Sequence, residues 1–242
     1  PRTAPPDTTE IVLDDVWLSY DGQVVLHGLS FTAKAGQTTA LVGPSGAGKS
    51  TVFNLLTRMV DPDRGLVSLG GAPVSDYDLG VLRDQFSTVA QESALFDETL
   101  RDNILMGRHI YMRPNPLASF FYPWWARKEE VAHRRKVEEV IDLLQLESAR
   151  DEHVDVIPLG LQKRVELARA LCAEPRLLVL DEPMAGMNQE EKEYMVRFIL
   201  DAQEALGLTV LIIEHHMDVI TAICDRVLVL SNGTEIAQGP AR

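Results

Sequence analysis

Residues 43–51 read Gly43-Pro44-Ser45-Gly46-Ala47-Gly48-Lys49-Ser50-Thr51. As far as Ser50 they match the spacing G-x-x-x-x-G-K-[ST], in which glycines let backbone N–H groups turn inward around phosphate oxygens. An apolar run precedes this stretch and a helical pattern follows it, so the helix would point its positive N-terminus at the same anion. Lys49 is expected to reach the β- and γ-phosphates of ATP, and the Ser50 hydroxyl to ligate Mg²⁺. A glycine-rich turn that binds nothing is the alternative. The strand-loop-helix context disfavours it, and we expect residues 43–51 to contribute to an ATP site.

A second stretch, residues 177–183, reads LLVLDEP. An apolar strand that ends in two carboxylates is weak evidence by itself, because many strands simply exit to solvent. Beside a phosphate loop it is much stronger, since Asp181 can enter the Mg²⁺ shell. Glu182 is then placed to polarise the attacking water as a general base. The two stretches together predict binding and hydrolysis of ATP.

The composition limits the partners and the compartment. The net charge of −13 argues against a nucleic-acid partner, because phosphate contacts need a basic surface. The two cysteines, Cys172 and Cys224, form no disulfide framework and are expected to be small core residues. No apolar run approaches the roughly 20 residues of a membrane helix. Any membrane contact is therefore expected to come through a partner or a segment outside this chain.

Hydrophobic periodicity predicts an α/β core interrupted by a helical lobe. Strands are expected at residues 11–20 and 24–35 around the turn Asp21-Gly22, and at 38–42, 177–180, 209–214 and 226–230, with a hairpin at Asn232-Gly233. Helices are expected after the phosphate loop, with a stripe that includes Leu56 and Met59, and at residues 190–206. The predicted organisation is a linker or tail at 1–10, the first part of an ATP-binding core at 11–90, a helical lobe at 91–164 and the second part of the core at 165–242.

With these motifs in place, residues 11–239 resemble the ATP-binding domains of ABC transporters. The resemblance implies a P-loop NTPase core with an antiparallel β subdomain and an inserted α-helical lobe. It gives Tyr20 the role of stacking on adenine, and gives Gln91 the role of sensing the γ-phosphate and Mg²⁺ while facing the membrane partner. Residues 185–188 match the family's dimer-contact loop, and His215 matches the switch histidine that touches the γ-phosphate. Without this context, Tyr20 would equally be a strand-end tyrosine and His215 a structural histidine.

The resemblance also implies partners and a location. ATP and Mg²⁺ would be held in a head-to-tail sandwich between this domain and a second copy or paralogous ATPase domain. A membrane-spanning transporter domain would place both on the cytoplasmic side of the inner membrane. The alternative is a nucleotide-binding or dimerisation module with little ATPase activity of its own. Soluble ABC proteins of translation or DNA repair are a third reading, but they usually carry paired cassettes or long coiled coils.

The segment that corresponds to the family signature L-S-G-G-Q departs from it. This chain has Ile157-Pro158-Leu159-Gly160-Leu161, followed by a helix expected over residues 164–171. Pro158 has neither hydroxyl nor N–H to offer a partner's γ-phosphate. Gly160 is retained, and we expect its backbone N–H to be available to that phosphate. The segment is therefore either a tolerated variant or a half-site that supports hydrolysis poorly.

The two halves of the chain resemble different ABC subfamilies. Residues 91–104 resemble exporters, whereas residues from about 107 onward resemble importers of branched-chain amino acids. Two hypotheses explain this pattern: an engineered chimera joined near residues 105–108, or a divergent natural protein. The aromatic cluster at residues 120–125 favours a core or loop contact in the lobe over a docking surface.

Overall fold

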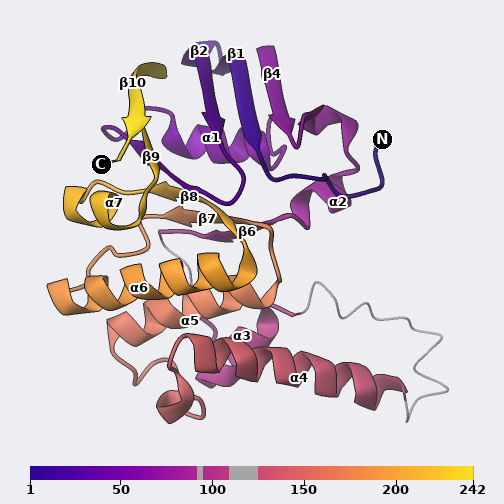
Figure 1. The fold of residues 1–242 in the computed structure, drawn as a ribbon, viewed down its shortest axis with the longest axis vertical. Helices are drawn as coiled ribbons and strands as arrows, with labels where there is room; N and C mark the ends of the chain where they lie inside the picture. Colours follow the sequence, from indigo (N-terminus) through magenta and orange to yellow (C-terminus); the bar gives the residue numbers. More distant parts are fainter. Residues whose placement is uncertain (92–94, 109–124, 242) are drawn as a thin grey trace. The chain divides into compact units, whose positions relative to one another are not determined.

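The computed structural model describes residues 1–91, 95–108 and 125–241 (Figure 1). It divides into two compact units. The first comprises Pro1–Gln91, Arg176–Ala185 and Ile199–Arg242. The second comprises Glu92–Pro175 and Gly186–Phe198. The aromatic cluster at residues 120–125 lies almost entirely outside the described residues, so its predicted role stays a prediction.

The first unit contains an antiparallel sheet in the order β2-β1-β4-β5 (Figure 1). Its strands are β1 (Ile11–Tyr20), β2 (Gln23–Ala33), β4 (Arg64–Leu69) and β5 (Ala72–Pro73). Tyr20 pairs with Gln23 across the two-residue turn of Asp21 and Gly22, which have φ values of 49° and 81°. Such a turn matches the twist of the flanking strands, which confirms the hairpin predicted from this dipeptide.

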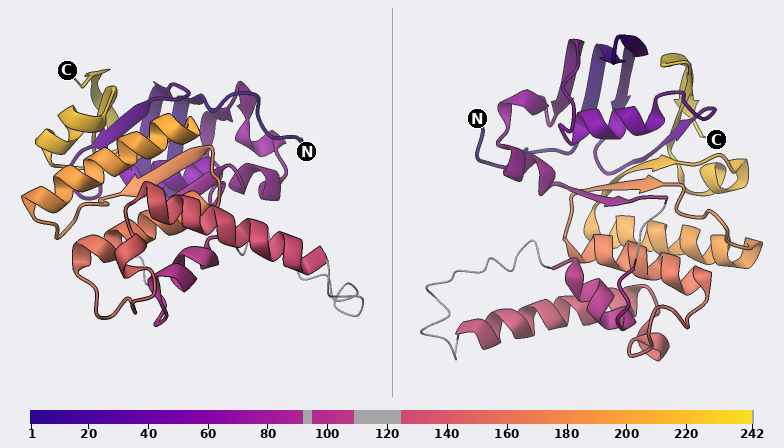
Figure 2. Two further views of the ribbon diagram at one scale, coloured as in Figure 1. Left: turned by 60° about the horizontal axis from the view of Figure 1, so that its bottom comes forward. Right: turned by 180° about the vertical axis from the view of Figure 1, so that it is seen from behind.

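The second sheet of this unit is mainly parallel, with the order β10-β9-β3-β8-β7-β6. Its strands are β3 (Thr38–Val42), β6 (Phe86–Val89), β7 (Leu177–Asp181), β8 (Thr209–Ile213), β9 (Arg226–Ser231) and β10 (Thr234–Pro240). Figure 2 shows the ribbon from two further sides. β3 pairs in parallel with β8 and β9, and β7 pairs in parallel with β6 and β8. The carboxyl ends of these strands therefore meet at one edge of the sheet, where ligands bind in open α/β sheets. The Asn232-Gly233 turn joins the antiparallel pair β9 and β10, as predicted.

The short helices of the first unit are α1 (Lys49–Leu56), η1 (Val74–Asp76), α2 (Leu79–Arg83) and α7 (Met217–Ile223). The last part of α6 (Gln189–Leu206), from Ile199 onward, also belongs to this unit. α1 is shorter than the apolar stripe predicted. It ends at Leu56, and Met59 is 65% exposed instead of packing on the core. Arg58 takes a left-handed conformation with φ 50°, which turns the chain out of the helix before Met59.

The second unit is helical. It contains α3 (Leu100–Met106), α4 (Trp125–Leu143), η3 (Glu147–Ala149), α5 (Leu159–Cys172) and the first part of α6 (Gln189–Leu206). The apolar side chains of Val137, Val140 and Ile141 on α4 are buried, as is Leu144 just beyond the helix. α3 and α5 approach closely at Gly107, where a Cβ atom would lie 2.1 Å from the Arg169 carbonyl oxygen. The prediction that the helix after Gly160 begins at residue 164 is wrong: α5 begins at Leu159, because Pro158 serves as its N-cap residue with φ −60° and ψ 154°.

Both cysteines are buried, as predicted for small core residues. Burial raises the pKa of Cys172 and of Cys224 to about 12, so both thiols stay protonated at neutral pH. Across residues 1–91, 95–108 and 125–241, no helix combines the length and the apolar character needed to span a membrane.

Candidate functional site

The loop between β3 and α1 depends on its glycines. Gly48 is the N-cap residue of α1 with φ 96°, a conformation that other residues adopt only at a cost. A Cβ atom on Gly43 would lie 2.2 Å from the carbonyl oxygen of Leu230 on β9. The loop is thus pressed against the neighbouring strand at one end and wound tightly into the helix at the other.

Lys49 begins α1 and turns back over the loop. Its Nζ atom donates hydrogen bonds to the carbonyl oxygens of Gly43 and Pro44, each at 2.8 Å. Ala47 faces the other way: its side chain is buried, and its backbone oxygen accepts a hydrogen bond from the N–H of Gly233 at 3.1 Å. The side chain of Ala47 therefore packs beneath the loop, while Lys49 stands at the mouth of the loop.

A pocket of about 640 Å³ opens over this loop, entirely within the first unit. It is lined by Val25, Gly43, Pro44, Ser45, Gly46, Gly48, Lys49, Ser50, Thr51, Gln91, Asp181, Glu182, Ile213 and His215. The structure therefore brings together every sequence-predicted residue of the loop except Ala47, with Gln91, both carboxylates and His215. Tyr20 is not part of this lining. It stands at the end of β1 with 38% of its surface exposed.

Two lining residues, Val25 and Ile213, were not anticipated from the sequence. Val25 comes from β2 in the antiparallel sheet, and its position depends on a contact remote in sequence: a Cβ atom on Gly233 would lie 1.8 Å from the Val25 carbonyl oxygen. Ile213 ends β8, next to Asp181 in the register of the parallel sheet. A single apolar residue in a strand gives no local signal of such a role.

Asp181 and Glu182 occupy the carboxyl end of β7. Burial raises the pKa of Asp181 above its usual value. The neighbouring Glu182 charge adds to this effect, whereas Lys49 opposes it. Glu182 has a φ of 48°, unusual for a residue with a side chain, and its N–H donates to the Ile213 oxygen at 3.0 Å. Such strain clusters at functional sites because the surrounding structure must enforce it.

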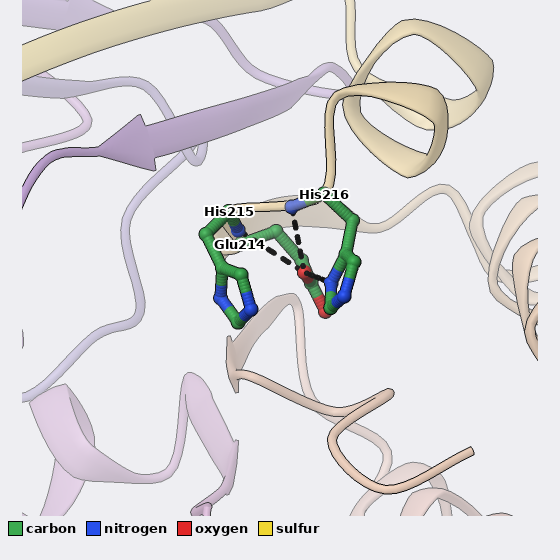
Figure 3. A group of neighbouring side chains, drawn as sticks. All are labelled: Glu214, His215 and His216. Atoms are coloured by element: carbon green, nitrogen blue, oxygen red, sulfur yellow. Dashed lines mark hydrogen bonds and ion pairs between the residues drawn. The ribbon is translucent and has the colours of Figure 1, made fainter.

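His215 follows β8 and faces Glu182, with Nδ1 3.8 Å from the Glu182 Oε1 atom. Its side chain is 58% exposed, so the ring is accessible to a ligand in the pocket. Glu214 and His216 lie on either side of it in the sequence, and Figure 3 shows the Glu214 carboxylate between the two rings. The backbone N–H of His215 donates to the Glu214 Oε2 atom at 3.1 Å. A buried carboxylate thus fixes the backbone that carries the predicted switch residue.

The signature segment lies in the second unit, at the start of α5. The N–H groups of Leu161 and Gln162 donate to the Pro158 oxygen at 2.9 and 3.0 Å, so the helix starts normally after a residue that has no N–H. Gly160 faces Glu191: a Cβ atom at Gly160 would lie 2.5 Å from the Glu191 Oε1 atom. A groove of about 530 Å³ here is lined by Gln145, Pro158, Gly160, Leu161, Arg164, Asn188, Glu190, Glu191 and Tyr194. Gly160 thus lines this groove but is itself buried, with Glu191 beside it, and the groove belongs to the second unit alone.

The pocket of the first unit has the chemistry of a nucleoside triphosphate site. The N-terminus of α1 and Lys49 supply positive potential for phosphates. The Ser50 hydroxyl, the Gln91 amide oxygen and the Asp181 carboxylate are hard oxygen donors of the type that Mg²⁺ prefers. Glu182 adds a second carboxylate that is not needed as a ligand and can accept a proton.

The chain is similar to known proteins in both sequence and fold. The ABC transporter family model matches residues 26–185. The chain is 32% identical over 240 residues to the probable branched-chain amino acid transport ATP-binding protein LivG of Methanocaldococcus jannaschii, covering 96% of this chain and 91% of that protein. It is 34% identical over 238 residues to the Nod factor export ATP-binding protein I of Rhizobium sp. strain N33, covering 95% and 70%. Among solved structures, cbiO1 of Clostridium perfringens, part of the ABC transporter complex cbiONQ, has a TM-score of 0.84 at 27% identity over 97% of this chain and 90% of that chain.

These similarities extend over nearly the whole chain and confirm the fold class predicted from the sequence. They also agree with the pocket, since a protein that binds and hydrolyses ATP needs both the phosphate loop and the carboxylates beside it. The chain belongs to the ABC transporter family, as an ATP-binding and ATP-hydrolysing motor domain.

Proposed function

We propose that the pocket over residues 43–51 binds ATP together with Mg²⁺ and that its side chains carry out the hydrolysis. Lys49 holds the β- and γ-phosphates. Ser50, Gln91 and Asp181 supply the oxygen ligands of the ion. The ion in turn lowers the negative charge that develops on the phosphates. The raised pKa of Asp181 agrees with this role, because a buried carboxylate beside a second one is stabilised by a cation.

Glu182 and His215 complete the chemistry. The water oxygen attacks the γ-phosphorus atom, the bond to the β–γ bridging oxygen breaks, and Glu182 accepts the proton of the water. His215 donates a hydrogen bond to the γ-phosphate from its exposed ring. Most of the rate enhancement comes from positioning and from neutralisation of charge, as in other phosphoryl transfers.

The nucleotide site needs partners to drive transport. We propose that a second copy or a paralogous domain packs head to tail on this chain, so that its signature segment covers the ATP. Gly160 would then offer its N–H to the partner's γ-phosphate, and residues 185–188 would contact the partner. Tyr20 would stack on adenine from the end of β1. A membrane-spanning domain would hold the pair on the cytoplasmic side of the membrane and select the cargo.

One observation carries the nucleotide proposal: the loop, Lys49, Gln91, both carboxylates and His215 line a single pocket. Lys49→Ala tests it, because Lys49 is the lysine placed at the phosphates. Isothermal titration with ATP and Mg²⁺ should show loss of measurable affinity in this variant. Lys34→Ala, an exposed lysine outside the lining, is the matched control and should bind as the unchanged chain does. Equal ATP affinity in the two variants would exclude the assignment.

A second candidate function rests on Pro158. Because the family's serine hydroxyl is replaced by a ring without a donor, the domain can bind ATP and dimerise while hydrolysing it poorly. Steady-state ATPase activity measured over a range of protein concentrations separates the two functions. Activity that rises more than linearly indicates hydrolysis in a dimer, whereas ATP binding with no turnover indicates the passive module.

A further inference from the structure

Three consecutive residues after β8 form a cluster of metal-ligating side chains. The ligand atoms of Glu214, His215 and His216 all lie within 4.8 Å of one another. The two imidazole rings stand 4.2 Å apart between centroids and are tilted by 35°. Figure 3 shows both rings extending in the same direction, with the Glu214 carboxylate between them. Nitrogen and oxygen atoms therefore converge on one small volume.

The carboxylate of this cluster is buried and only partly satisfied. Glu214 is 2% exposed. Its Oε2 atom accepts from the His215 N–H and lies 3.0 Å from the His216 Nδ1 atom. Its Oε1 atom has no hydrogen-bond partner among the residues that the structure describes. Burying a carboxylate oxygen without a hydrogen-bond partner costs free energy, and a bound phosphate, which is itself negative, would not supply that partner. An additional cation would satisfy it.

We propose that Glu214, His215 and His216 form a binding site for a transition-metal ion, with Zn²⁺ as the preferred occupant. Two imidazoles and one carboxylate are a common ligand set for zinc that keeps a fourth position open. Mg²⁺ is a poor match because it prefers oxygen ligands, so this site is chemically distinct from the ion site at Ser50 and Asp181. The buried carboxylate supplies the negative charge, and the half-exposed rings leave a path for the ion.

Occupation of this site has a consequence for hydrolysis, which rests on the function proposed for His215. A zinc ion bound through the His215 ring takes the nitrogen lone pair and holds the ring beside Glu214. The ring is then not free to contact the γ-phosphate, and Glu182 lies only 3.8 Å from the same ring. Zinc should therefore inhibit the ATPase. By linkage, ATP with Mg²⁺ should weaken the binding of zinc by the same factor by which zinc weakens the binding of ATP with Mg²⁺.

The binding test uses the whole chain and Zn²⁺ alone, without nucleotide. Isothermal titration should show one zinc ion bound per chain, and Co²⁺ should give the visible absorption of a site with nitrogen ligands. His216→Asn keeps an amide nitrogen near the place of Nδ1 but removes the imidazole, and should weaken zinc binding by at least about 10–100-fold, since even outer-shell changes cost that much. Zinc should raise the thermal unfolding midpoint of the unchanged chain but not that of His216→Asn, a readout that also shows that the variant is folded.

His153→Asn is the matched control. His153 belongs to the other group of potential ligands in the described residues, with Asp97 and Asp155, all exposed and in the second unit. Zinc affinity should be unchanged in this variant. The proposal is overturned if the unchanged chain binds zinc no more tightly than His216→Asn, or if His153→Asn loses as much affinity.

The activity test separates this site from the proposed function. Each variant's ATPase rate with zinc is compared with its own rate without zinc, at excess Mg²⁺. Zinc should inhibit the unchanged chain and His153→Asn at concentrations that leave His216→Asn unaffected. Tight zinc binding that does not slow hydrolysis would support the metal site and overturn the role given to His215.

Discussion

Replacement of Glu182 by glutamine tests the proposed role of this residue as a general base separately from its role in the backbone structure. Glutamine has nearly the same shape, so it can keep the backbone φ of 48° and the hydrogen bond from its N–H to Ile213. It cannot accept a proton from water. Loss of a general base costs about 10²–10⁴ in rate, which corresponds to about 2.7–5.4 kcal/mol of transition-state stabilisation.

The strained backbone suggests a second variant, which should differ from Glu182→Gln in stability. A residue with a side chain pays about 1–2 kcal/mol in the left-handed region, which glycine avoids. Glycine also has more conformational freedom in the unfolded chain, and this lowers the free energy of unfolding by about 0.5–1 kcal/mol. Glu182→Gly should therefore be about as stable as the unchanged chain or up to about 1.5 kcal/mol more stable. Glu182→Gln should leave the stability unchanged.

Activity, ATP affinity and stability, measured on the same preparations, test these expectations. Steady-state phosphate release should fall in both variants, while titration with ATP should show affinities close to that of the unchanged chain. Denaturant unfolding should rank Glu182→Gly at or above the other two. Turnover of Glu182→Gln within tenfold of the unchanged chain would refute the assignment of Glu182 as the base. A strongly destabilised Glu182→Gly would refute the inference that φ at this position stores strain.

Three further predictions concern the rest of the chain. Tyr20→Ala should weaken ATP binding by about 5–150-fold if the ring stacks on adenine, because base–aromatic stacking is worth about 1–3 kcal/mol; unchanged affinity would leave Tyr20 as a strand-end residue. Glu174→Gln should cost up to about 1 kcal/mol at pH 7, because Glu174 pairs with Arg108 but is 46% exposed. Burial would raise the pKa of Glu174, but hydrogen bonds and charge from Arg108 and Lys136 outweigh burial and hold this pKa below its usual 4.5. The difference in unfolding free energy between the variant and the unchanged chain should therefore vanish as the pH falls through the lowered pKa. A difference that stays constant with pH would contradict this linkage. Restoring the signature with Pro158→Ser, Leu159→Gly and Leu161→Gln should raise the ATPase rate without changing monomer affinity for ATP, and an equal rate would show that the segment is already competent or that no sandwich dimer forms.

The parts of the fold that the sequence predicted correctly depend on local chemistry. The strand, loop and helix around Lys49 follow from the glycine spacing and from the apolar run before it. The β1–β2 hairpin follows from the Asp21-Gly22 turn. In both places residues that are neighbours in sequence supply the whole signal, so tertiary contacts had little to add.

Other features of the fold had weak or misleading signals in the sequence. Met59 fitted the helical stripe, but the helix ends at Leu56 and Arg58 takes a left-handed conformation, with its guanidinium bonded to Asp61 and to the Ser75 oxygen. The short strand β6 was not anticipated, since a four-residue run gives weak periodicity. Gln91 was placed at the site by family resemblance alone. The hypothesis of a join near residues 105–108 stays a prediction.

The signature segment shows how a residue can satisfy the fold and still alter the chemistry. Pro158 costs α5 nothing, because an N-cap residue needs no N–H of its own. Gly160 lies in the first turn, where the helix dipole favours a negative charge. In this chain the Glu191 carboxylate already lies against Gly160, and the N–H of Asn188 holds it at 2.9 Å. A negative charge so close to Gly160 would repel a phosphate that approached it. We therefore propose that the Glu191 carboxylate, together with the missing hydroxyl at residue 158, weakens this half-site.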